Sequence, residues 1–274
     1  VLSAGSVVDL APAAMGRAIL HGYLGGEAGA GAMAELLYGD ANPSGKLAES
    51  YPRALSDTPA YPYRKLRGNC AEYRESIYVG YRYYDKAKVP LRYPFGFGLS
   101  YTRFVYEGLQ LSEAGVRFRL RNTGSRAGAE IAELYIGAAE SETFRPEKEL
   151  KGFAKVFLKA GEEREVFIPF DDKSFRVFDS VSNRFLEESG RYRILIGASA
   201  ADIRLNGELV RAGEKLCRAD EKKRLPHYFS GAAQQVGRAE FERLFGRKLE
   251  RHPIAGELLR GDAVHELRRS RGLL

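Results

Sequence analysis

The sequence has no tryptophan, two cysteines and four histidines among its 274 residues. Cys70 and Cys217 lie far apart and fit no metal-binding or redox spacing, so we expect two free thiols, a state that favours a reducing compartment such as the cytoplasm. The histidines share no ligand spacing, and no nucleotide, metal or Gly-x-Ser-x-Gly motif is present. No apolar run approaches the roughly 20 residues of a membrane span. We therefore expect no metal centre, no nucleotide site and no membrane-spanning segment.

The chain begins at Val1 without an initiator methionine or a secretory apolar region. This start is typical of a sequence that is cut into just before or inside a strand. Any targeting signal would then lie on upstream residues, so the compartment is otherwise unknown from the sequence.

The net charge of +7 is concentrated at the end of the chain. Residues 211–274 contain fifteen Lys or Arg and nine Asp or Glu, a net charge of +6. A basic segment can bind nucleic acid, but Glu and Arg alternate here, which is typical of a solvated helical face. We expect no nucleic-acid partner; binding at low salt that falls steeply with added salt would indicate the alternative.

Residues 1–60 have the pattern expected at the end of an α/β domain. Val1–Gly5 suits a strand that runs into a glycine turn. Pro12–Tyr23 and Glu27–Tyr38 have the apolar spacing of helices. The glycines of Gly25–Gly31 lack the Gly-Lys-Ser/Thr ending of a phosphate loop, so close packing between a helix and a sheet explains them better.

Segment 61–101 contains an aromatic stretch, Tyr73–Tyr101, in which nine of the 31 Phe and Tyr residues of the chain are found. Gly96 and Gly98 alternate with aromatic rings after Pro94, which predicts backbone that bends or closely approaches another segment. The rings can form an aromatic seam between two domains or a platform that faces a sugar. The composition alone favours the seam.

Residues 102–210 change to short runs with strand character, separated by turn signals. Val116–Arg121 alternates apolar and basic residues strictly, as a strand with one solvated face does. Seven or eight such strands within about a hundred residues predict an antiparallel β-sandwich. The expected strands are Phe104–Leu111, Val116–Arg121, Glu130–Ile136, Phe153–Leu158, Glu165–Phe170, Ser174–Phe178, Tyr192–Ile196 and Ile203–Leu209.

The basic tail, residues 211–274, is predicted to be partly helical. Leu225–Tyr228 has the composition of an extended linker. Arg238–Phe245 has Phe and Leu on one helical face and is followed by the stop signal Gly246, and Ala255–Leu274 offers further amphipathic helix. The tail carries too little apolar surface to fold alone, so we expect it to dock onto the rest of the protein.

Four segments occur in the order and approximate spacing of a known family. They are Ala18–Gly29, Leu37–Leu47, Val79–Asp85 and Tyr93–Tyr101. Together they resemble the C-terminal part of glycoside hydrolase family 3, the β-glucosidase family. The later segments Arg121–Glu130, Glu133–Tyr135, Leu150–Phe153 and Gly190–Ile194 resemble the fibronectin type III-like domain with which members of this family often end.

The resemblance implies a multidomain fold: part of an α/β sandwich with a mostly parallel sheet, then an all-β immunoglobulin- or fibronectin III-like sandwich and a helical tail. It implies a retaining enzyme that hydrolyses terminal β-linked sugars without a metal or organic cofactor. The family's nucleophile Asp lies on an N-terminal (β/α)8 barrel and its acid/base lies upstream of Val1, so no catalytic residue is assigned here. The implied partners are that missing part, in cis or as a separate chain, and a carbohydrate.

By the same resemblance, we expect Tyr73, Arg74 and Glu75 near the active-site mouth of the complete enzyme, as candidate substrate-binding residues. Among the acids, Glu72 and Glu75 are the most interesting, but Arg74 and Arg82 are near enough in sequence to pair with Glu75 and lower its pKa. Ion pairing at an interface is therefore favoured over catalysis, and the chain alone is expected to be inactive. The alternative is a free-standing, non-catalytic β-sandwich module that binds carbohydrate or protein.

Overall fold

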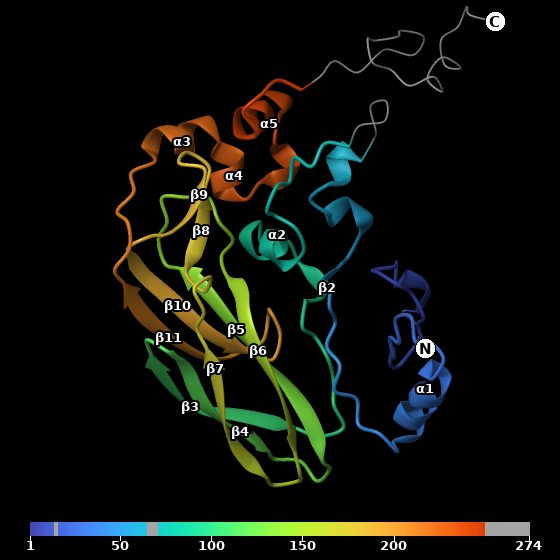
Figure 1. Ribbon diagram of the computed structural model, residues 1–274. Helices are drawn as coiled ribbons and strands as arrows, with labels where there is room; N and C mark the ends of the chain where they lie inside the picture. The colour runs from blue at the N-terminus through green and yellow to red at the C-terminus, as the bar shows by residue number, and fades with distance from the viewer. Residues whose placement is uncertain (14–15, 65–70, 250–274) are drawn as a thin grey trace, which may run out of the picture.

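The computed structural model describes residues 1–13, 16–64 and 71–249 (Figure 1). A β-sandwich forms the left and lower part of the molecule in Figure 1, the N-terminal segment runs along its right side, and the helices of the tail lie at the upper end. The structure is multidomain in architecture, with antiparallel sheets and few helices. None of the helices in these described ranges is long and apolar enough to cross a bilayer.

The sandwich is built from two antiparallel sheets and a hairpin. One sheet has the strand order β11-β10-β5-β6, the other has the order β3-β4-β7, and β8 pairs with β9. The bounds are β3 Phe104–Ser112, β4 Gly115–Asn122, β5 Gly128–Ala138, β6 Glu149–Leu158, β7 Glu163–Pro169, β8 Arg176–Asp179, β9 Arg184–Glu187, β10 Gly190–Gly197 and β11 Ile203–Arg211. The predicted antiparallel sandwich is therefore present, with β9 as a strand that the sequence pattern did not indicate.

The core of the sandwich follows the alternation of apolar and polar residues. In β4, Val116, Phe118 and Leu120 are buried, while the arginines between them are exposed. Leu134 of β5 and Ile194 of β10 belong to the same buried cluster from the facing sheet. Because side chains of a strand point to opposite faces in turn, this pattern also sets the register of each pair.

The N-terminal segment contains one α-helix and short irregular elements. Its elements are η1 Ala11–Ala13, α1 Gly29–Tyr38, β1 Tyr51–Pro52, η2 Leu55–Asp57 and η3 Tyr61–Tyr63. Helix α1 ends at Gly39, whose φ of 83° is the left-handed conformation expected of a glycine stop. The predicted helix over Glu27–Tyr38 is confirmed from Gly29 onward.

The predicted helix over Pro12–Tyr23 is wrong over residues 16–23, whereas Pro12 and Ala13 lie in the 3-10 helix η1, Ala11–Ala13. Residues 16–23 contain no helix, and Leu2 and His21 instead form an isolated parallel bridge. The amide of Leu2 donates to the carbonyl of Leu20, and the amide of Gly22 donates to the carbonyl of Leu2, both at 2.8 Å. Pairing with a distant segment supplies the backbone hydrogen bonds here, and this outweighs the helical spacing of the side chains.

The aromatic stretch crosses from the N-terminal segment to the sandwich. It contains α2, Tyr81–Lys86, and β2, Leu91–Tyr93, and β2 pairs antiparallel with β1 through Tyr51 and Tyr93. Gly80 precedes α2 with φ 58° and ψ −140°, a conformation open to glycine and few other residues. This glycine allows the chain to turn sharply into α2.

The tail contains three short helices and one 3-10 turn: α3 Ala219–Arg224, α4 Pro226–Ser230, η4 Ala233–Gln235 and α5 Arg238–Phe245. The prediction for α5 and for its stop at Gly246, with φ 78°, is confirmed. The extended linker predicted at Leu225–Tyr228 is wrong, because Pro226 opens α4 in the first-turn position that suits proline. The amphipathic helix predicted within Ala255–Leu274 lies outside the described residues.

A second buried cluster, the joint cluster, links the aromatic stretch to the tail. Its members are nearly completely buried. They come from α2 and the residues just before it, from the loop after β5 and from the tail. They are Tyr78, Tyr83, Tyr84, Phe144, Leu225, Tyr228, Ala233 and Val236. The tail therefore docks on the rest of the protein, and half of this core belongs to it.

Candidate functional site

The loop after β2 lies directly against the outer face of β5. Gly96 has φ 79°, and a Cβ added at this position would lie 2.8 Å from the carboxyl carbon of Glu133. A Cβ at Gly98 would lie 2.5 Å from the carbonyl oxygen of Gly45. Both glycines therefore permit close approach, as the sequence predicts, and at Gly96 the backbone conformation demands glycine as well.

Glu133 is the acid that this loop buries. Its side chain is 4% exposed, and its carboxylate accepts a 2.6 Å hydrogen bond from the hydroxyl of Tyr135. Burial raises the pKa of Glu133 to about 7, against the opposing effects of the Tyr135 bond and of the nearby Lys46 ammonium. The neighbouring Glu130 raises it further and forms a 2.7 Å ion pair with Lys46. A carboxyl that titrates near neutral pH thus lies at the contact between the loop and the sandwich.

Most of the aromatic stretch forms the seam that its composition favours. Tyr78, Tyr83 and Tyr84 are 0–5% exposed and belong to the joint cluster. Tyr81 packs on Phe95 with ring centroids 5.2 Å apart, and its hydroxyl accepts a 2.8 Å hydrogen bond from the amide of Leu150. These rings hold the N-terminal segment to the sandwich rather than face solvent.

The three candidate substrate-binding residues lie at one end of this seam, in different environments. Tyr73 is 72% exposed. The guanidinium of Arg74 donates to the carboxylate of Glu72 at 2.7 Å and packs 5.0 Å above the ring of Tyr63. Tyr73 is therefore the one whose ring is presented to solvent, while Arg74 is engaged within the protein.

Glu75 differs from the sequence prediction. Arg74 pairs with Glu72, and Arg82 lies 3.5 Å from Glu149, so neither arginine forms an ion pair with Glu75 in the described structure. The Glu75 side chain is 6% exposed, and its Oε2 has no hydrogen-bond partner among the described residues. Burial therefore raises the pKa of Glu75, where nearby arginines were expected to lower it. The predicted ion pair is wrong because the turn directs the neighbouring guanidinium to Glu72.

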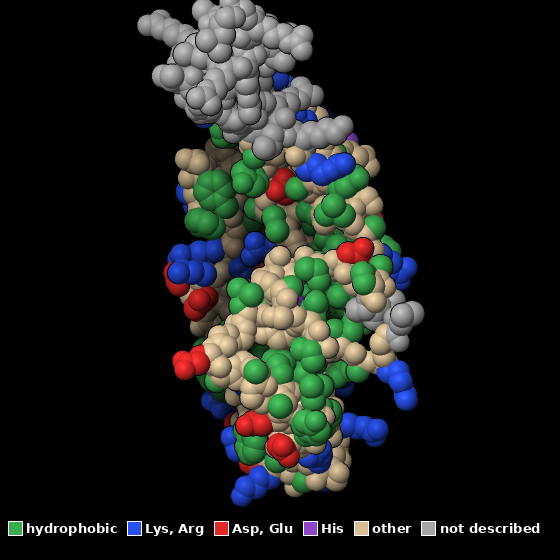
Figure 2. Space-filling model, turned by 90° about the vertical axis from the view of Figure 1, so that its right-hand side faces the viewer, with side chains coloured by type: hydrophobic (Ala, Val, Ile, Leu, Met, Phe, Trp, Pro, Cys, Tyr) green, Lys and Arg blue, Asp and Glu red, His purple; other side chains and the backbone are tan. Residues whose placement is uncertain are grey.

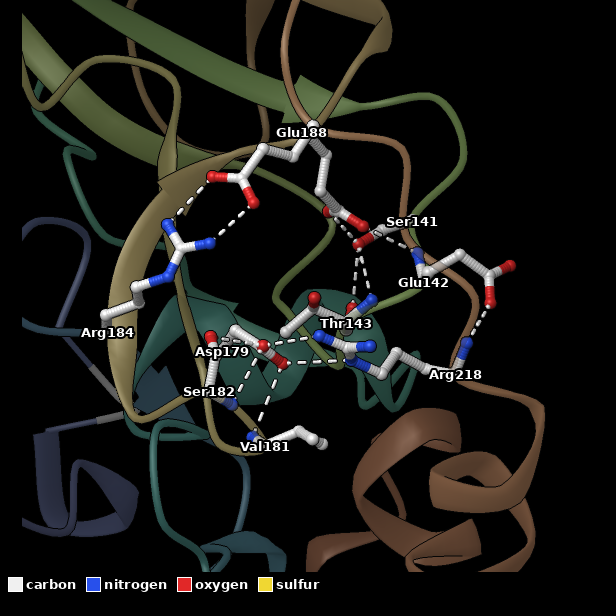
Figure 3. Close-up of polar contacts among 10 residues, drawn as sticks. Ser141, Glu142, Thr143, Asp179, Val181, Ser182, Arg184, Glu188 and Arg218 are labelled. Atoms are coloured by element: carbon white, nitrogen blue, oxygen red, sulfur yellow. Dashed lines mark hydrogen bonds and ion pairs between the residues drawn. The ribbon is translucent and has the colours of Figure 1, made fainter.

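A polar network joins the tail to the sandwich (Figure 3). Arg218 lies with its guanidinium against the carboxylate of Asp179, at 2.6 Å. Burial alone would raise the pKa of Asp179, but the hydrogen bonds from Arg218 and Ser182 hold it well below its usual range. Glu142 accepts from the backbone amide of Arg218 at 3.0 Å and pairs with Lys222 at 2.7 Å. The segment between β11 and α3 is therefore bonded to the β8–β9 hairpin through Asp179 and to the loop after β5 through Glu142.

Several large apolar side chains are exposed on the N-terminal segment. Figure 2 shows hydrophobic side chains on this side of the molecule, interspersed with polar and charged ones. Large apolar side chains that are more than half exposed there are Leu24, Leu37, Tyr38 and Leu55, and α1 has no buried residue.

The structure also contains an open groove of about 680 Å³ between α2 and the outer face of β10 and β11. Four of its charged side chains form ion pairs: Lys148 with Asp85 at 2.5 Å, and Arg193 with Glu147 at 3.3 Å. Lys88 and Glu208 line the groove as well.

The histidine and cysteine residues considered in the sequence form no metal-binding cluster in the part of the chain that the structure describes. His21 stacks on Tyr23 with ring centroids 3.9 Å apart, and its Nδ1 lies 3.0 Å from the hydroxyl of Tyr51, so its ring is part of the local packing. Cys217 is a free, exposed thiol, while Cys70 lies outside the described residues. Within the described part of the chain, no cluster of three or more His, Cys, Asp or Glu residues is placed to hold a metal ion.

Comparisons with known proteins match the two halves of this architecture. Residues 1–101 match the model of the glycosyl hydrolase family 3 C-terminal domain, and residues 130–200 match that of the fibronectin type III-like domain. The chain belongs to glycoside hydrolase family 3. Thermostable β-glucosidase B of Acetivibrio thermocellus is 42% identical over 211 residues, which cover 74% of this chain and 28% of that protein.

Two further family members are similar to this chain over about the same share of its length. An exo-α-(1→6)-L-arabinopyranosidase of Bifidobacterium breve is 38% identical over 209 residues, 74% of this chain and 28% of its own length. The crystal structure of the family 3 β-glucosidase of Bifidobacterium adolescentis superimposes with a TM-score of 0.74 at 36% identity, over 78% of this chain and 32% of that one. The chain spans about a quarter of the length of the curated relatives it matches. It thus corresponds to the C-terminal part of the family 3 β-glucosidases.

Sequence reasoning missed two features of this family 3 segment. Glu133 lies on the outer face of β5, opposite Phe153 of β6, in a position that looks solvated until the Gly96 loop covers it. Two signals were present in the sequence, the family motif Glu133–Tyr135 and the close-approach glycine Gly96 upstream of it. Neither signal indicates that the two segments meet. Asp179 and Arg218 lie 39 residues apart and carry no local signal of their pairing.

Proposed function

We propose that the chain is the C-terminal, non-catalytic part of a retaining β-glucosidase-like enzyme that releases terminal β-linked sugars. The observation that carries this proposal is the match to family 3 β-glucosidases over most of this chain but only about a quarter of theirs. In such enzymes two carboxylates must lie about 5–5.5 Å apart. We assign neither of them to this chain, and its own role is to support and complete the catalytic part.

The proposed domain layout follows the sequence prediction. Residues 1–60 are the end of an α/β sandwich domain, 61–101 the aromatic interface segment, 102–210 the fibronectin type III-like sandwich and 211–274 the partly helical basic tail. The isolated parallel bridge between Leu2 and His21 supports the first assignment, because it is the pairing of a parallel sheet that upstream strands would extend. The helices α3 to α5 support the last one.

The proposed partner is the upstream part of the enzyme: a (β/α)8 barrel and the first strands of the α/β domain, in cis or as a separate chain. The exposed apolar side chains of the N-terminal segment support this, since Leu37 and Tyr38 of α1 are 58% and 86% exposed. No residue of α1 is fully buried, and a helix with apolar side chains packs against a further layer to bury them. The substrate is a carbohydrate, held mainly by that upstream part.

Within this chain, we propose Tyr73, Arg74 and Glu75 as the residues nearest the active-site mouth. The exposed ring of Tyr73 suits stacking on a sugar face. Arg74 and Glu75 are engaged or buried, so they shape the turn that carries Tyr73. Which sugar is released is a separate matter, because the glucosidases and the arabinopyranosidase are about equally similar to this chain.

A chimera tests this proposal. The upstream part of the Acetivibrio thermocellus β-glucosidase B, up to the residue that matches Val1, is joined to residues 1–274 and assayed with an aryl β-glucoside. We expect the chimera to hydrolyse the glycoside and the 274-residue chain alone to release no product. Appreciable turnover by the chain alone, or a folded chimera without activity, would contradict the proposal.

A further inference from the structure

The turn that carries Tyr73 has unusual backbone directly after Glu75. Ser76 has a φ of 52°, which a residue with a Cβ rarely adopts, and Gly80 has a φ of 58°. Within the turn, the amide of Ser76 donates to the carbonyl of Tyr73 at 3.2 Å, and the amide of Tyr78 donates to the carbonyl of Glu75 at 3.0 Å. A conformation of this cost persists only where the surrounding structure holds it.

One tail residue contacts both ends of this turn. The hydroxyl of Tyr228 donates to the carbonyl of Arg74 at 2.9 Å, and the carbonyl of Tyr228 accepts from the hydroxyl of Tyr78 at 2.5 Å. Tyr228 is 0% exposed, and burial raises the pKa of its hydroxyl, so the group stays a neutral donor. Two hydrogen bonds from one residue thus bracket Ser76.

Neighbouring tail residues reinforce the same contact. The hydroxyl of Tyr63 lies 2.8 Å from the carbonyl of Ala233, and the guanidinium of Arg74 lies 3.3 Å from that of Val236. The side-chain amide Nε2 of Gln234 donates to the backbone carbonyls of Ser56 and Thr58 at 2.7 and 2.9 Å. The tail therefore hydrogen-bonds to residues on both sides of the turn. These tail residues lie beyond the matched family segments, which end at residue 200.

We propose that Tyr228 is a positioning residue: by clamping Arg74 and Tyr78 it holds the turn that presents Tyr73 to the substrate. The tail is then a part of the binding site that acts through the turn and does not itself touch the sugar. The role assigned to Tyr73 rests on the proposed function, whereas the clamp itself rests on the contacts of this chain alone.

The test of the clamp uses the 274-residue chain and the variant Tyr228→Phe, which keeps the ring and removes the donor to Arg74. Amide hydrogen exchange at Ser76 and Tyr78 should become about fivefold faster, as expected for the loss of one hydrogen bond. Because the chain has no tryptophan, Tyr73→Trp adds a single fluorescent reporter, and its anisotropy should fall in the Tyr228→Phe background.

The matched control is Tyr192→Phe, which removes another buried hydroxyl that donates to a backbone carbonyl, that of Glu188 at 2.9 Å, in the sandwich. It should leave exchange at Ser76 and Tyr78 and the anisotropy of the reporter unchanged. Equal effects of the two variants would mean loss of overall stability and would overturn the clamp, as would no effect of Tyr228→Phe.

In the active chimera, Tyr228→Phe should raise KM for the aryl glycoside severalfold with kcat within about twofold, and Tyr192→Phe should change neither. An unchanged KM would overturn the positioning role. An inactive chimera would instead contradict the proposed function, while the exchange measurement would still decide on the clamp. The two failures are therefore distinguishable.

Discussion

Replacement of Glu133 by glutamine should stabilise the protein at neutral pH and change how its stability depends on pH. Glutamine has nearly the shape of glutamate and still offers an oxygen to the hydroxyl of Tyr135, which lies 2.6 Å away. It cannot ionise. The variant therefore removes the cost of a charge at a site that is 4% exposed and covered by the Gly96 loop.

The magnitude follows from the shifted pKa. Burial raises the pKa of Glu133 to about 7 in the folded protein from its usual 4.5. A raised folded pKa contributes stability that is fully present below the unfolded pKa and is lost as the pH rises through the folded one. Between pH 5 and pH 8 the parent should lose about 2.5 kcal/mol relative to Glu133→Gln, because each pKa unit corresponds to about 1.4 kcal/mol.

Urea unfolding of the two proteins at constant ionic strength, from pH 5 to pH 8, measures this difference. Other titrating groups are shared by both proteins and cancel in the comparison. Glu163→Gln, on the solvated face of β7, is the matched control and should leave the pH dependence as it is in the parent. Two parallel stability curves for the parent and Glu133→Gln would refute the reasoning, as would a gap that closes as the pH rises.

Two further changes test the joint and the tail. Gly96→Ala should destabilise the protein by about 2 kcal/mol or more in urea unfolding, since it adds a Cβ against Glu133 at a positive φ. Gly161→Ala, at φ 78° with no neighbour within 4 Å, should show the backbone cost of about 1 kcal/mol alone; equal losses would argue against the close contact. Asp179→Asn should cost about 3 kcal/mol at pH 7 by leaving Arg218 unpaired. Because the folded pKa of Asp179 is lowered, the parent should lose that advantage as the pH falls below about 4, and an equal acid sensitivity in both proteins would contradict the ion pair.

The tail is an integral part of the joint cluster. Tyr228 and Leu225 are as deeply buried as Tyr78, and the cluster they share is separate from the core of the sandwich. Removal of the tail would expose several of the aromatic rings of the seam at once. The seam is therefore a three-way contact between the N-terminal segment, the sandwich and the tail.

How far sequence reasoning succeeded depended on whether the signal was local. Val116–Arg121 predicted β4 because a strand alternates its faces, and Arg238–Phe245 with Gly246 predicted α5 because a helix has one apolar face and a glycine end. Pro12–Tyr23 misled because its spacing suits a helix while its backbone pairs in part with Leu2. Leu225–Tyr228 misled because a proline at a first helical turn looks like a break.

In the candidate site, too, the local motif was predictable and the side-chain contacts were not. The motif around Tyr73 was recognisable in the sequence, but the sequence placed Arg74 beside Glu75, and the structure pairs Arg74 with Glu72 and buries Glu75 instead. In a turn of a few residues, the direction of each side chain depends on the dihedral angles, and here Ser76 adopts a left-handed φ that adjacency in sequence does not reveal.

By itself, the sequence determined the family, the antiparallel sandwich and the aromatic seam, because periodicity and motif order are properties of neighbouring residues. Only the tertiary structure decided which residues meet across the chain: Gly96 with Glu133, Asp179 with Arg218, and Tyr228 with the turn before Tyr78. Burial and charge pairing depend on the segments that cover a side chain. A carboxyl such as Glu133 therefore acquires its neutral-pH titration from a loop 37 residues away in sequence, through desolvation that no local pattern records.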